Sequence, residues 1–248
     1  MSATVTVLGS SGMFATTERA CSGYLVDLDG FRLWMDAGAG TWRNLLDVID
    51  YPELDGIVLS HRHPDHTTDV YQAFHARHYG GREPLRSVPL WAPQETLERL
   101  CSFGGELAQS FELRPVAPGD EVRVERATLS FSPMVHPPVT LGVRIEHAGG
   151  VLAYSADTGP TADFAPLARR ADVFVCEATL QDADASWEGH MRASESGRVA
   201  AEQEVSTLVL SHLPPHKDPA MSLEQARASA DGVDVVLARD GMVIEVGS

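Results

Sequence analysis

Four residues that can bind metals stand close together in one short segment, at His61, His63, Asp65 and His66. The apolar residues 56–60 precede this segment and are predicted to form a buried strand, so the segment begins where that strand ends. In an extended chain His61 and His63 point the same way, whereas Pro64 is typical of the first turn of a helix. Imidazoles and a carboxylate at this density predict a centre for zinc, manganese or iron. The alternative is a solvated polar loop.

Three more residues of the same chemical types follow other predicted strands. His136 follows residues 128–135, Asp157 follows residues 151–155, and His212 follows residues 207–211. One histidine at a strand end is more often structural than metal-binding. Several independent strand ends that each offer His or Asp indicate instead that these residues complete the site begun by the histidine cluster.

The elements that must position these residues alternate along the chain. Strands are predicted at residues 4–8, 23–28, 31–35, 56–60, 88–92, 121–125, 128–135, 142–147, 151–155, 173–178, 207–211, 233–238 and 242–246, and helices at residues 41–49, 69–79, 94–103, 162–170, 193–202 and 223–230. Strands flanked by helices in both halves favour an α/β fold with helices packed outside the sheets. With no repeat and no long linker, a single domain over residues 1–248 is predicted.

Composition limits the partners of the protein. The net charge is -16, from 19 basic and 35 acidic residues, which argues against a groove for long nucleic acid because phosphate neutralisation needs clustered Lys and Arg. A small anion drawn to bound cations is still compatible with this charge. The cysteines (Cys21, Cys101 and Cys176) have no paired spacing, and there is no signal-peptide pattern or long apolar run. We therefore expect a cytoplasmic protein without a membrane segment.

The spacing His-x-His-x-Asp-His at residues 61–66 resembles the metallo-β-lactamase superfamily, and the resemblance extends over nearly the whole chain. It implies a four-layer αββα sandwich, in which two mixed β-sheets carry helices on their outer faces. It also implies two metal ions, one held by His61, His63 and His136 and the other by Asp65, His66 and His212. Asp157 would bridge the two ions, and Asp36 would support the site from behind.

A closer resemblance concerns the phosphodiesterase branch, because the secreted β-lactamases have a metal-site cysteine and a signal peptide that are not found here. Residues 189–191 (Gly-His-Met), followed by a helix and by residues 208–215, look like the Z-type ribonucleases that process tRNA 3′ ends. That likeness implies that His190 acts beside the scissile phosphate and that Glu177 orients it. Only twenty residues separate His136 from Asp157, which leaves no room for the tRNA-clasping arm of those ribonucleases.

Within that branch, residues 9–12, 65–69 and 212–215 look like the actinobacterial class II-like cyclic nucleotide phosphodiesterases. The implied activity is hydrolysis of a small phosphodiester of the 3′,5′-cyclic AMP type, with two divalent ions, most simply Zn²⁺ and otherwise Mn²⁺ or Fe²⁺. A water shared by two such ions is acidified enough to attack phosphorus. Asp65 would aim that water, and His190 would protonate the leaving oxygen. The resemblance also implies a homodimer.

Several alternatives stay open at this point. The same metals would serve a lactone, thioester or β-lactam hydrolase, a Z-type ribonuclease, or a binding protein that has lost turnover. The locally basic residues 75–86 either line the mouth of the site or form a solvated helix and loop. Trp187 is the aromatic residue best placed to stack on a nucleotide base, whereas Trp34, Trp42 and Trp91 are expected in the core.

Overall fold

The computed structural model describes residues 2–81, 85–104 and 106–247, and these residues form two seven-stranded sheets. The first sheet has the order β14-β1-β2-β3-β4-β5-β6 and the second the order β13-β12-β11-β10-β9-β8-β7. The first contains β1 (Ala3–Gly9), β2 (Gly23–Leu28), β3 (Phe31–Ala37), β4 (Gly56–Val58), β5 (Val88–Ala92), β6 (Phe111–Pro115) and β14 (Val243–Glu245). The second contains β7 (Glu121–Val124), β8 (Ala127–Pro133), β9 (Leu141–His147), β10 (Gly150–Tyr154), β11 (Val173–Glu177), β12 (Thr207–Ser211) and β13 (Asp234–Leu237).

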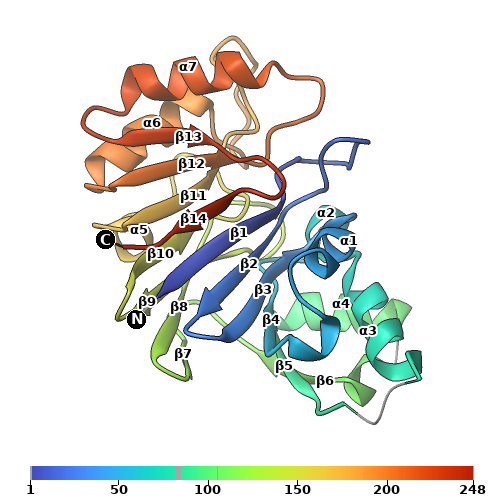
Figure 1. Ribbon diagram of the computed structural model, residues 1–248. Coiled ribbons are helices and arrows are strands. Elements are labelled where there is room, and N and C mark those ends of the chain that lie inside the picture. The colour runs from blue at the N-terminus through green and yellow to red at the C-terminus, as the bar shows by residue number, and fades with distance from the viewer. Residues whose placement is uncertain (1, 82–84, 105, 248) are drawn as a thin grey trace.

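Helices cover the outer face of each sheet, so the four-layer αββα arrangement predicted from the sequence is confirmed. Figure 1 shows α6 and α7 over the second sheet and α1 to α4 beside the first, with both termini at the same end of the strands. The helices are α1 (Thr41–Leu46), α2 (Pro64–Thr67), α3 (Val70–Tyr79), α4 (Gln94–Phe103), α5 (Ala165–Ala168), α6 (Ala193–Glu202) and α7 (Pro219–Ser229). Two short 3₁₀ turns are η1 (Tyr51–Glu53) and η2 (Leu107–Gln109).

Each sheet is antiparallel on one side and parallel on the other. Strands β3 to β6 run parallel to one another, and so do β10 to β13. In open parallel sheets the carboxyl ends of the strands lie on one edge, where the following loops form a ligand-binding crevice. This arrangement places the segments that follow β3, β4, β10, β11 and β12 in the same region of the molecule.

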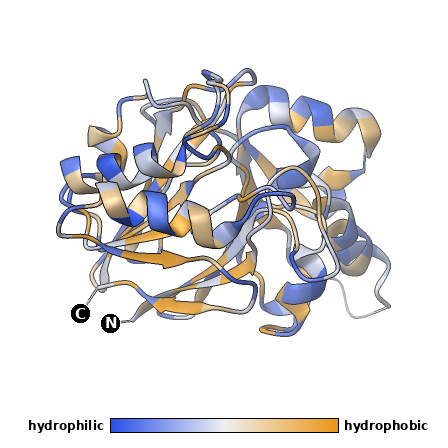
Figure 2. Ribbon diagram, turned by 90° about the horizontal axis from the view of Figure 1, so that it is seen from above, coloured by the Kyte–Doolittle hydropathy of each residue, from blue (hydrophilic) through white to orange (hydrophobic). Residues whose placement is uncertain are grey.

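The hydrophobic core lies between the two sheets, with a further apolar cluster under each helical layer. In β8 every second residue (Ala127, Leu129 and Phe131) points into this core, as a strand with one buried face requires. Strand β11 is buried along its whole length because both of its faces are covered. Figure 2 shows the strands as mainly hydrophobic ribbons and the helices as ribbons of mixed hydropathy.

The structure differs from the prediction at four elements. Strand β6 was not predicted, because two of its five residues are charged and it ends in proline, a composition tolerated at a sheet edge. The first helix ends at Leu46 instead of residue 49, and the helix predicted at residues 162–170 is confined to Ala165–Ala168. The last helix begins at Pro219, four residues earlier than predicted, because Asp218 caps it by accepting a hydrogen bond from the Ala220 N–H.

Candidate metal centre

The seven predicted metal-binding residues come together at one edge of the sandwich. Within the described part of the chain they form two groups whose potential ligand atoms lie within 4.8 Å of one another. One group contains His61, His63, His136 and Asp157, and the other contains Asp65, His66 and His212. Strands β4, β8, β10 and β12 and the short helix α2 supply these residues, so segments up to about 150 positions apart in the sequence build one site.

Asp157 lies between the two groups, with one carboxylate oxygen facing each. Its Oδ2 atom is 3.7 Å from Nε2 of His61 and 3.8 Å from Nε2 of His136. Its Oδ1 atom is 3.2 Å from Nε2 of His66 and 3.3 Å from Nε2 of His212. A carboxylate in this position offers one oxygen to each of the two groups of donors.

Ring nitrogens of different histidines face each other at close range. Nδ1 of His63 is 3.2 Å from Nε2 of His136, and Nε2 of His66 is 3.3 Å from Nε2 of His212. In neutral imidazoles each ligating nitrogen presents a lone pair, and a cation shared by the two nitrogens removes the repulsion between those lone pairs. The facing pairs therefore suit bound cations.

Two buried atoms of the centre make no hydrogen bond, namely Nε2 of His61 and Oδ1 of Asp157. A buried polar atom without a partner is costly and calls for an explanation such as an ion. Both atoms point into the centre, where a metal would satisfy them. The residues present thus fit divalent metal ions, and nitrogen and carboxylate donors suit zinc, manganese or iron.

The charge distribution of the centre agrees with cation binding. Burial lowers the pKa values of His61, His63 and His136, so these rings are held in the neutral form that can donate a lone pair. Burial alone would also lower the pKa of His66, but the carboxylates of Asp157, Asp36 and Asp65 raise it well above its usual range. Negative charge therefore exceeds positive charge around His66, and this is the side of the centre that most needs a cation.

Abrupt turns at the strand ends aim these side chains inward. Asp36, Ala156 and His212 adopt the left-handed region, with φ of 56°, 52° and 55°. Such backbone strain is concentrated at functional sites in proteins. Neighbouring glycines allow the close approach of the segments, because a Cβ on Gly38 would lie 2.1 Å from the Asp65 carbonyl oxygen and one on Gly12 would lie 2.6 Å from that of His212.

Asp36 is fully buried behind the centre and accepts four hydrogen bonds. Its donors are the N–H and Oγ of Ser60, each at 2.7 Å, Nδ1 of His66 at 2.7 Å and the hydroxyl of Tyr154 at 2.6 Å. The bond to Nδ1 turns Nε2 of His66 toward the centre, as carboxylates behind metal-binding histidines commonly do. The sequence indicated Asp36, but nothing in it indicated Tyr154, which joins the site only through the packing of the two sheets.

Three other histidines of the centre are held through their second ring nitrogen. Nδ1 of His212 is 2.9 Å from Oγ1 of Thr179, and Nδ1 of His136 donates to the Gly189 carbonyl oxygen at 2.9 Å. Nδ1 of His61 is 3.0 Å from Oγ of Ser60. These supporting residues were not predicted from the sequence, although Ser60 and Gly189 stand directly beside predicted site residues.

Replacing Asp36 with asparagine tests this support. The amide presents a donor where four donors already converge, so we expect Zn²⁺ affinity to fall about 10- to 100-fold, the usual cost of losing such a partner. Affinity is measured by competition with a chromophoric chelator. Asp27→Asn in the neighbouring strand β2 is the control and should bind Zn²⁺ like the parent. Equal affinity in the Asp36 and Asp27 variants would show that Asp36 does not orient His66.

His190 and Glu177 form a dyad next to the metal centre. Nδ1 of His190 is 2.7 Å from Oε1 of Glu177, and a His190 ring nitrogen lies within 4.8 Å of ligand atoms of Asp157 and His212. The buried Glu177 carboxylate also accepts the backbone N–H groups of Thr158 at 2.7 Å, Thr179 at 3.2 Å and Met191 at 3.4 Å. These donors fix the position of the carboxylate. The dyad thus offers an oriented imidazole beside the facing metal ligands.

Trp187 borders the same side of the centre and is 47% exposed. Its ring centroid is 4.7 Å from that of His190 and 5.7 Å from that of His136. An indole ring that is half exposed beside the dyad is available to an incoming ligand. Trp34 and Trp91 are buried, and Trp42 packs against Trp34 with ring centroids 5.9 Å apart.

Among the basic residues 75–86, those that the structure describes do not line the site. This corrects the interpretation that they line its mouth. Arg77 is buried and donates to the carbonyl oxygens of Tyr51 and Arg86, and Arg86 pairs with Asp55. Asp55 precedes β4, whereas the histidine cluster follows it, so these contacts lie at the opposite end of that strand. The bond to the Tyr51 carbonyl oxygen joins Arg77 to η1. Arg82 lies outside the described residues.

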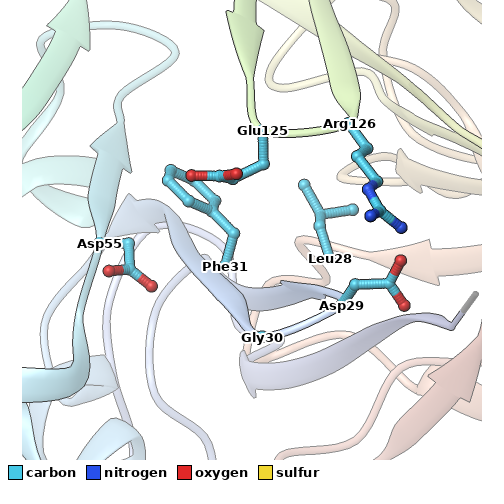
Figure 3. A pocket seen from close by; sticks show the side chains of 7 residues that line it. All are labelled: Leu28, Asp29, Gly30, Phe31, Asp55, Glu125 and Arg126. Carbon is cyan, nitrogen blue, oxygen red and sulfur yellow. The ribbon is translucent and has the colours of Figure 1, made fainter.

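A hollow of about 600 Å³ also lies at that opposite end (Figure 3). It is lined by Leu28, Asp29, Gly30, Phe31, Asp55, Glu125 and Arg126. Two of its three carboxylates already have structural partners, because Asp29 accepts the Ser2 N–H and lies 3.3 Å from Nε2 of His147, and Asp55 accepts the Arg32 N–H. It contains no predicted site residue, so the chemistry of the protein is not expected there.

Comparisons with known proteins agree with these observations. A family model described as "Beta-lactamase superfamily domain" matches residues 32–213. An uncharacterized protein of Mycobacterium leprae is 34% identical over 238 residues, covering 92% of this chain and 84% of that protein. A ribonuclease Z of Kineococcus radiotolerans is 30% identical over 258 residues, covering 83% of this chain and 82% of that protein. The crystal structure of the metallo-beta-lactamase fold protein YhfI from Bacillus subtilis is 26% identical, with a TM-score of 0.90, and covers 98% of this chain and 99% of that chain. The YhfI sequence is named a probable metallo-hydrolase.

Among the described residues, no helix is long and apolar enough to cross a membrane.

Proposed function

Because the chain belongs to the beta-lactamase superfamily and is a metal-dependent hydrolase, we propose that it hydrolyses a small phosphodiester, most simply a 3′,5′-cyclic nucleotide. The superfamily resemblance predicted from residues 61–66 is confirmed by the family match. The observation that carries the proposal is the His190–Glu177 dyad, placed within reach of two groups of metal ligands. Hydrolysis of an alkyl phosphodiester needs a proton donor at the leaving oxygen, and the dyad supplies one.

In this proposal one divalent ion is held by the group of His61, His63 and His136 and a second by the group of Asp65, His66 and His212, with Asp157 between them. Zn²⁺ is the simplest choice for this mixture of imidazole and carboxylate donors. Ions bound there would supply an acidified water and would neutralise charge on the phosphoryl oxygens. The remaining tasks fall to side chains of the protein.

Asp65 is the residue that we assign to orienting the attacking water. Its Oδ2 atom accepts the Met13 N–H at 2.9 Å and lies 3.4 Å from Nε2 of His212. Both contacts fix the carboxylate at the edge of the centre. Nearby His66 and His212 hold the pKa of Asp65 well below its usual range despite burial, so the group is an acceptor at neutral pH. An anionic acceptor in this position aligns a water by accepting one of its protons.

His190 is the residue that we assign to protonating the leaving oxygen. The Nδ1–H group is committed to Glu177, so a proton on the other ring nitrogen, Nε2, faces away from that carboxylate. The contact with Glu177 also fixes the orientation of the His190 ring. A positioned general acid typically contributes about 10²- to 10⁴-fold in rate. Glu177 positions the acid and does not itself contact the substrate in this proposal.

The size of the substrate is inferred from charge and from the segment between His136 and Asp157. Strands β9 and β10 occupy most of that segment, so nothing there extends outward to hold a folded RNA. The net charge of -16 adds repulsion against a long polyanion. Ribonuclease Z activity is the second candidate, favoured by the similarity to the Kineococcus protein. We prefer a cyclic nucleotide because residues 9–12, 65–69 and 212–215 resemble enzymes that act on one.

The proposal is tested with protein loaded with Zn²⁺ or Mn²⁺ and a panel of substrates. We expect turnover of bis(p-nitrophenyl) phosphate and of at least one of cyclic AMP, cyclic GMP and the 2′,3′-cyclic nucleotides. Precursor tRNA, a lactone, a thioester and a chromogenic β-lactam complete the panel. Faster cleavage of precursor tRNA than of the cyclic nucleotides would identify the protein as a ribonuclease. Hydrolysis of the acyl substrates alone would show that the protein is not a phosphodiesterase. Inertness toward every compound would point to a protein that binds metals without turnover.

A further inference from the structure

A second hollow, of about 380 Å³, opens directly beside His190. It is lined by Pro160, Thr161, Ser186, Trp187, Glu188, His190, Arg192 and Glu195. His190 is also within 4.8 Å of ligand atoms of Asp157 and His212, so the hollow shares one wall with the metal centre. A nucleotide whose phosphate lies at the metal centre would therefore extend its nucleoside portion into this hollow, past the imidazole of His190.

Trp187 forms a flat apolar wall of this hollow. Its ring lies against the Gly189 backbone, since a Cβ on Gly189 would come within 2.8 Å of the indole and within 3.2 Å of the Pro137 ring. Only glycine permits this close approach. Because the indole keeps 47% of its surface exposed, a planar group can stack on it, and base stacking on aromatic side chains is a general mode of nucleotide binding.

The polar groups of the hollow suit a neutral partner better than a second phosphate. Arg192 donates to the Asp184 carbonyl oxygen at 2.9 Å, and its other terminal nitrogen lies 3.6 Å from Glu195. Two carboxylates, Glu188 and Glu195, therefore stand against one guanidinium that is already partly engaged. Hydroxyl and amide-like groups of a ribose or a base can exchange hydrogen bonds with such a surface, whereas an additional phosphate meets repulsion.

The loop that leads to Trp187 is anchored at residues 181–184. Nε2 of Gln181 donates to the Asp218 carbonyl oxygen at 2.8 Å and to Oγ of Ser222 at 3.1 Å. Lys217, the single lysine of the sequence, pairs with Asp184. These bonds tie residues 181–184 to the start of α7. A loop anchored at its base has less freedom to lose on binding, which favours affinity for a small partner.

We propose that this hollow binds the neutral nucleoside portion of the substrate, with its base stacked on Trp187. The inference rests on the proposed phosphodiesterase function and deepens it, because it assigns the nucleoside to the side of the leaving oxygen that His190 protonates. It specifies a nucleoside phosphodiester without further phosphate groups. Trp187 is accordingly the residue that decides binding of the base.

The test measures binding of adenosine, guanosine and cytidine to the zinc-loaded full chain by titration calorimetry, so no turnover is required. We expect the purine nucleosides to bind and Trp187→Leu to weaken their binding about tenfold or more, because the stacking surface is lost. Trp187→Phe keeps an aromatic face and should retain binding within about threefold of the parent. Phe103→Leu removes an exposed aromatic ring on α4, 83% exposed and not part of the hollow, and should bind like the parent.

The nucleoside site and the phosphodiesterase function can be refuted separately. If cyclic nucleotides are hydrolysed but adenosine binds equally to the parent and to Trp187→Leu, the nucleoside site is refuted while the phosphodiesterase stands. If no phosphodiester is hydrolysed but adenosine binds in a Trp187-dependent way, the hollow is a nucleoside site and the proposed function is wrong. Absence of nucleoside binding to the zinc-loaded parent also refutes the inference. Thermal unfolding of each variant confirms that the substitution leaves the fold intact.

Discussion

Replacing Asp157 with alanine is expected to reduce bound metal from two ions per chain to at most one and to lower kcat/KM for phosphodiester hydrolysis by about 10³-fold or more. Each carboxylate oxygen of Asp157 faces a different group of ligands, at 3.2 to 3.8 Å from their ring nitrogens. The substitution therefore removes one donor from both groups at once. It also removes the negative charge that would lie between two like-charged cations.

Metal content is measured by atomic emission after equilibration against buffered Zn²⁺, and activity by release of p-nitrophenolate from bis(p-nitrophenyl) phosphate. Asp231→Ala is the matched control, since Asp231 is an exposed aspartate in the turn before β13, and it should keep both the metal content and the rate of the parent. An Asp157→Ala protein that retained two ions and most of its activity would refute the bridging assignment. If Asp157→Ala lost activity but kept the metal content of the parent, Asp157 would take part in the reaction without being needed to hold the metal.

Replacing His190 with alanine is expected to lower kcat for a cyclic nucleotide about 10²- to 10⁴-fold while lowering kcat for bis(p-nitrophenyl) phosphate about tenfold at most. The ribose 3′ oxygen leaves as a strongly basic alkoxide and needs a proton, whereas p-nitrophenolate is stable without one. An effect that depends on the leaving group identifies a proton donor. A general disturbance of the site would slow both substrates alike.

The control for this prediction is His216→Ala. His216 is exposed four residues after His212, and its replacement should change neither rate by more than about twofold, since it has no contact with the proposed dyad. Metal content must be measured in parallel, because His190 also lies within 4.8 Å of ligand atoms of Asp157 and His212. A fall in bound metal in His190→Ala would make His190 a ligand, and an equal loss of rate with both substrates would make it a positioning residue.

Much of the site could be predicted from sequence because its donor residues stand in short segments with a recognisable pattern. The spacing of residues 61–66 brings four donors together whatever the rest of the chain does, since two extended residues and one helical turn are enough. His136, Asp157 and His212 were recognisable as residues that follow apolar strands. Sheets with helices packed outside were predictable for a similar reason, because strand and helix periodicities are properties of short windows. The four αββα layers were implied by the resemblance to the metallo-β-lactamase superfamily.

Elements with weak local signals were predicted less well. Strand β6 was missed because only Phe111 of its five residues is buried, and pairing with its neighbour β5 defines this edge strand. The ends of α1 and α5 were misplaced because capping and packing, and not propensity, decide where short helices stop. The function of Arg77 and Arg86 was open because their charge alone does not say which carbonyl or carboxylate lies within reach.

The sequence by itself determined which residue types are available for catalysis and that they follow strands; only the tertiary structure decided how they face one another. That Asp157 turns one oxygen to each ligand group depends on the registers of β10, β11 and β12 and on the left-handed Ala156. The bond from Tyr154 to Asp36 exists only because two sheets, distant in sequence, pack with their strand ends together. Distances of a few ångströms between remote segments follow from the packing of the whole core, and no short stretch of sequence encodes them.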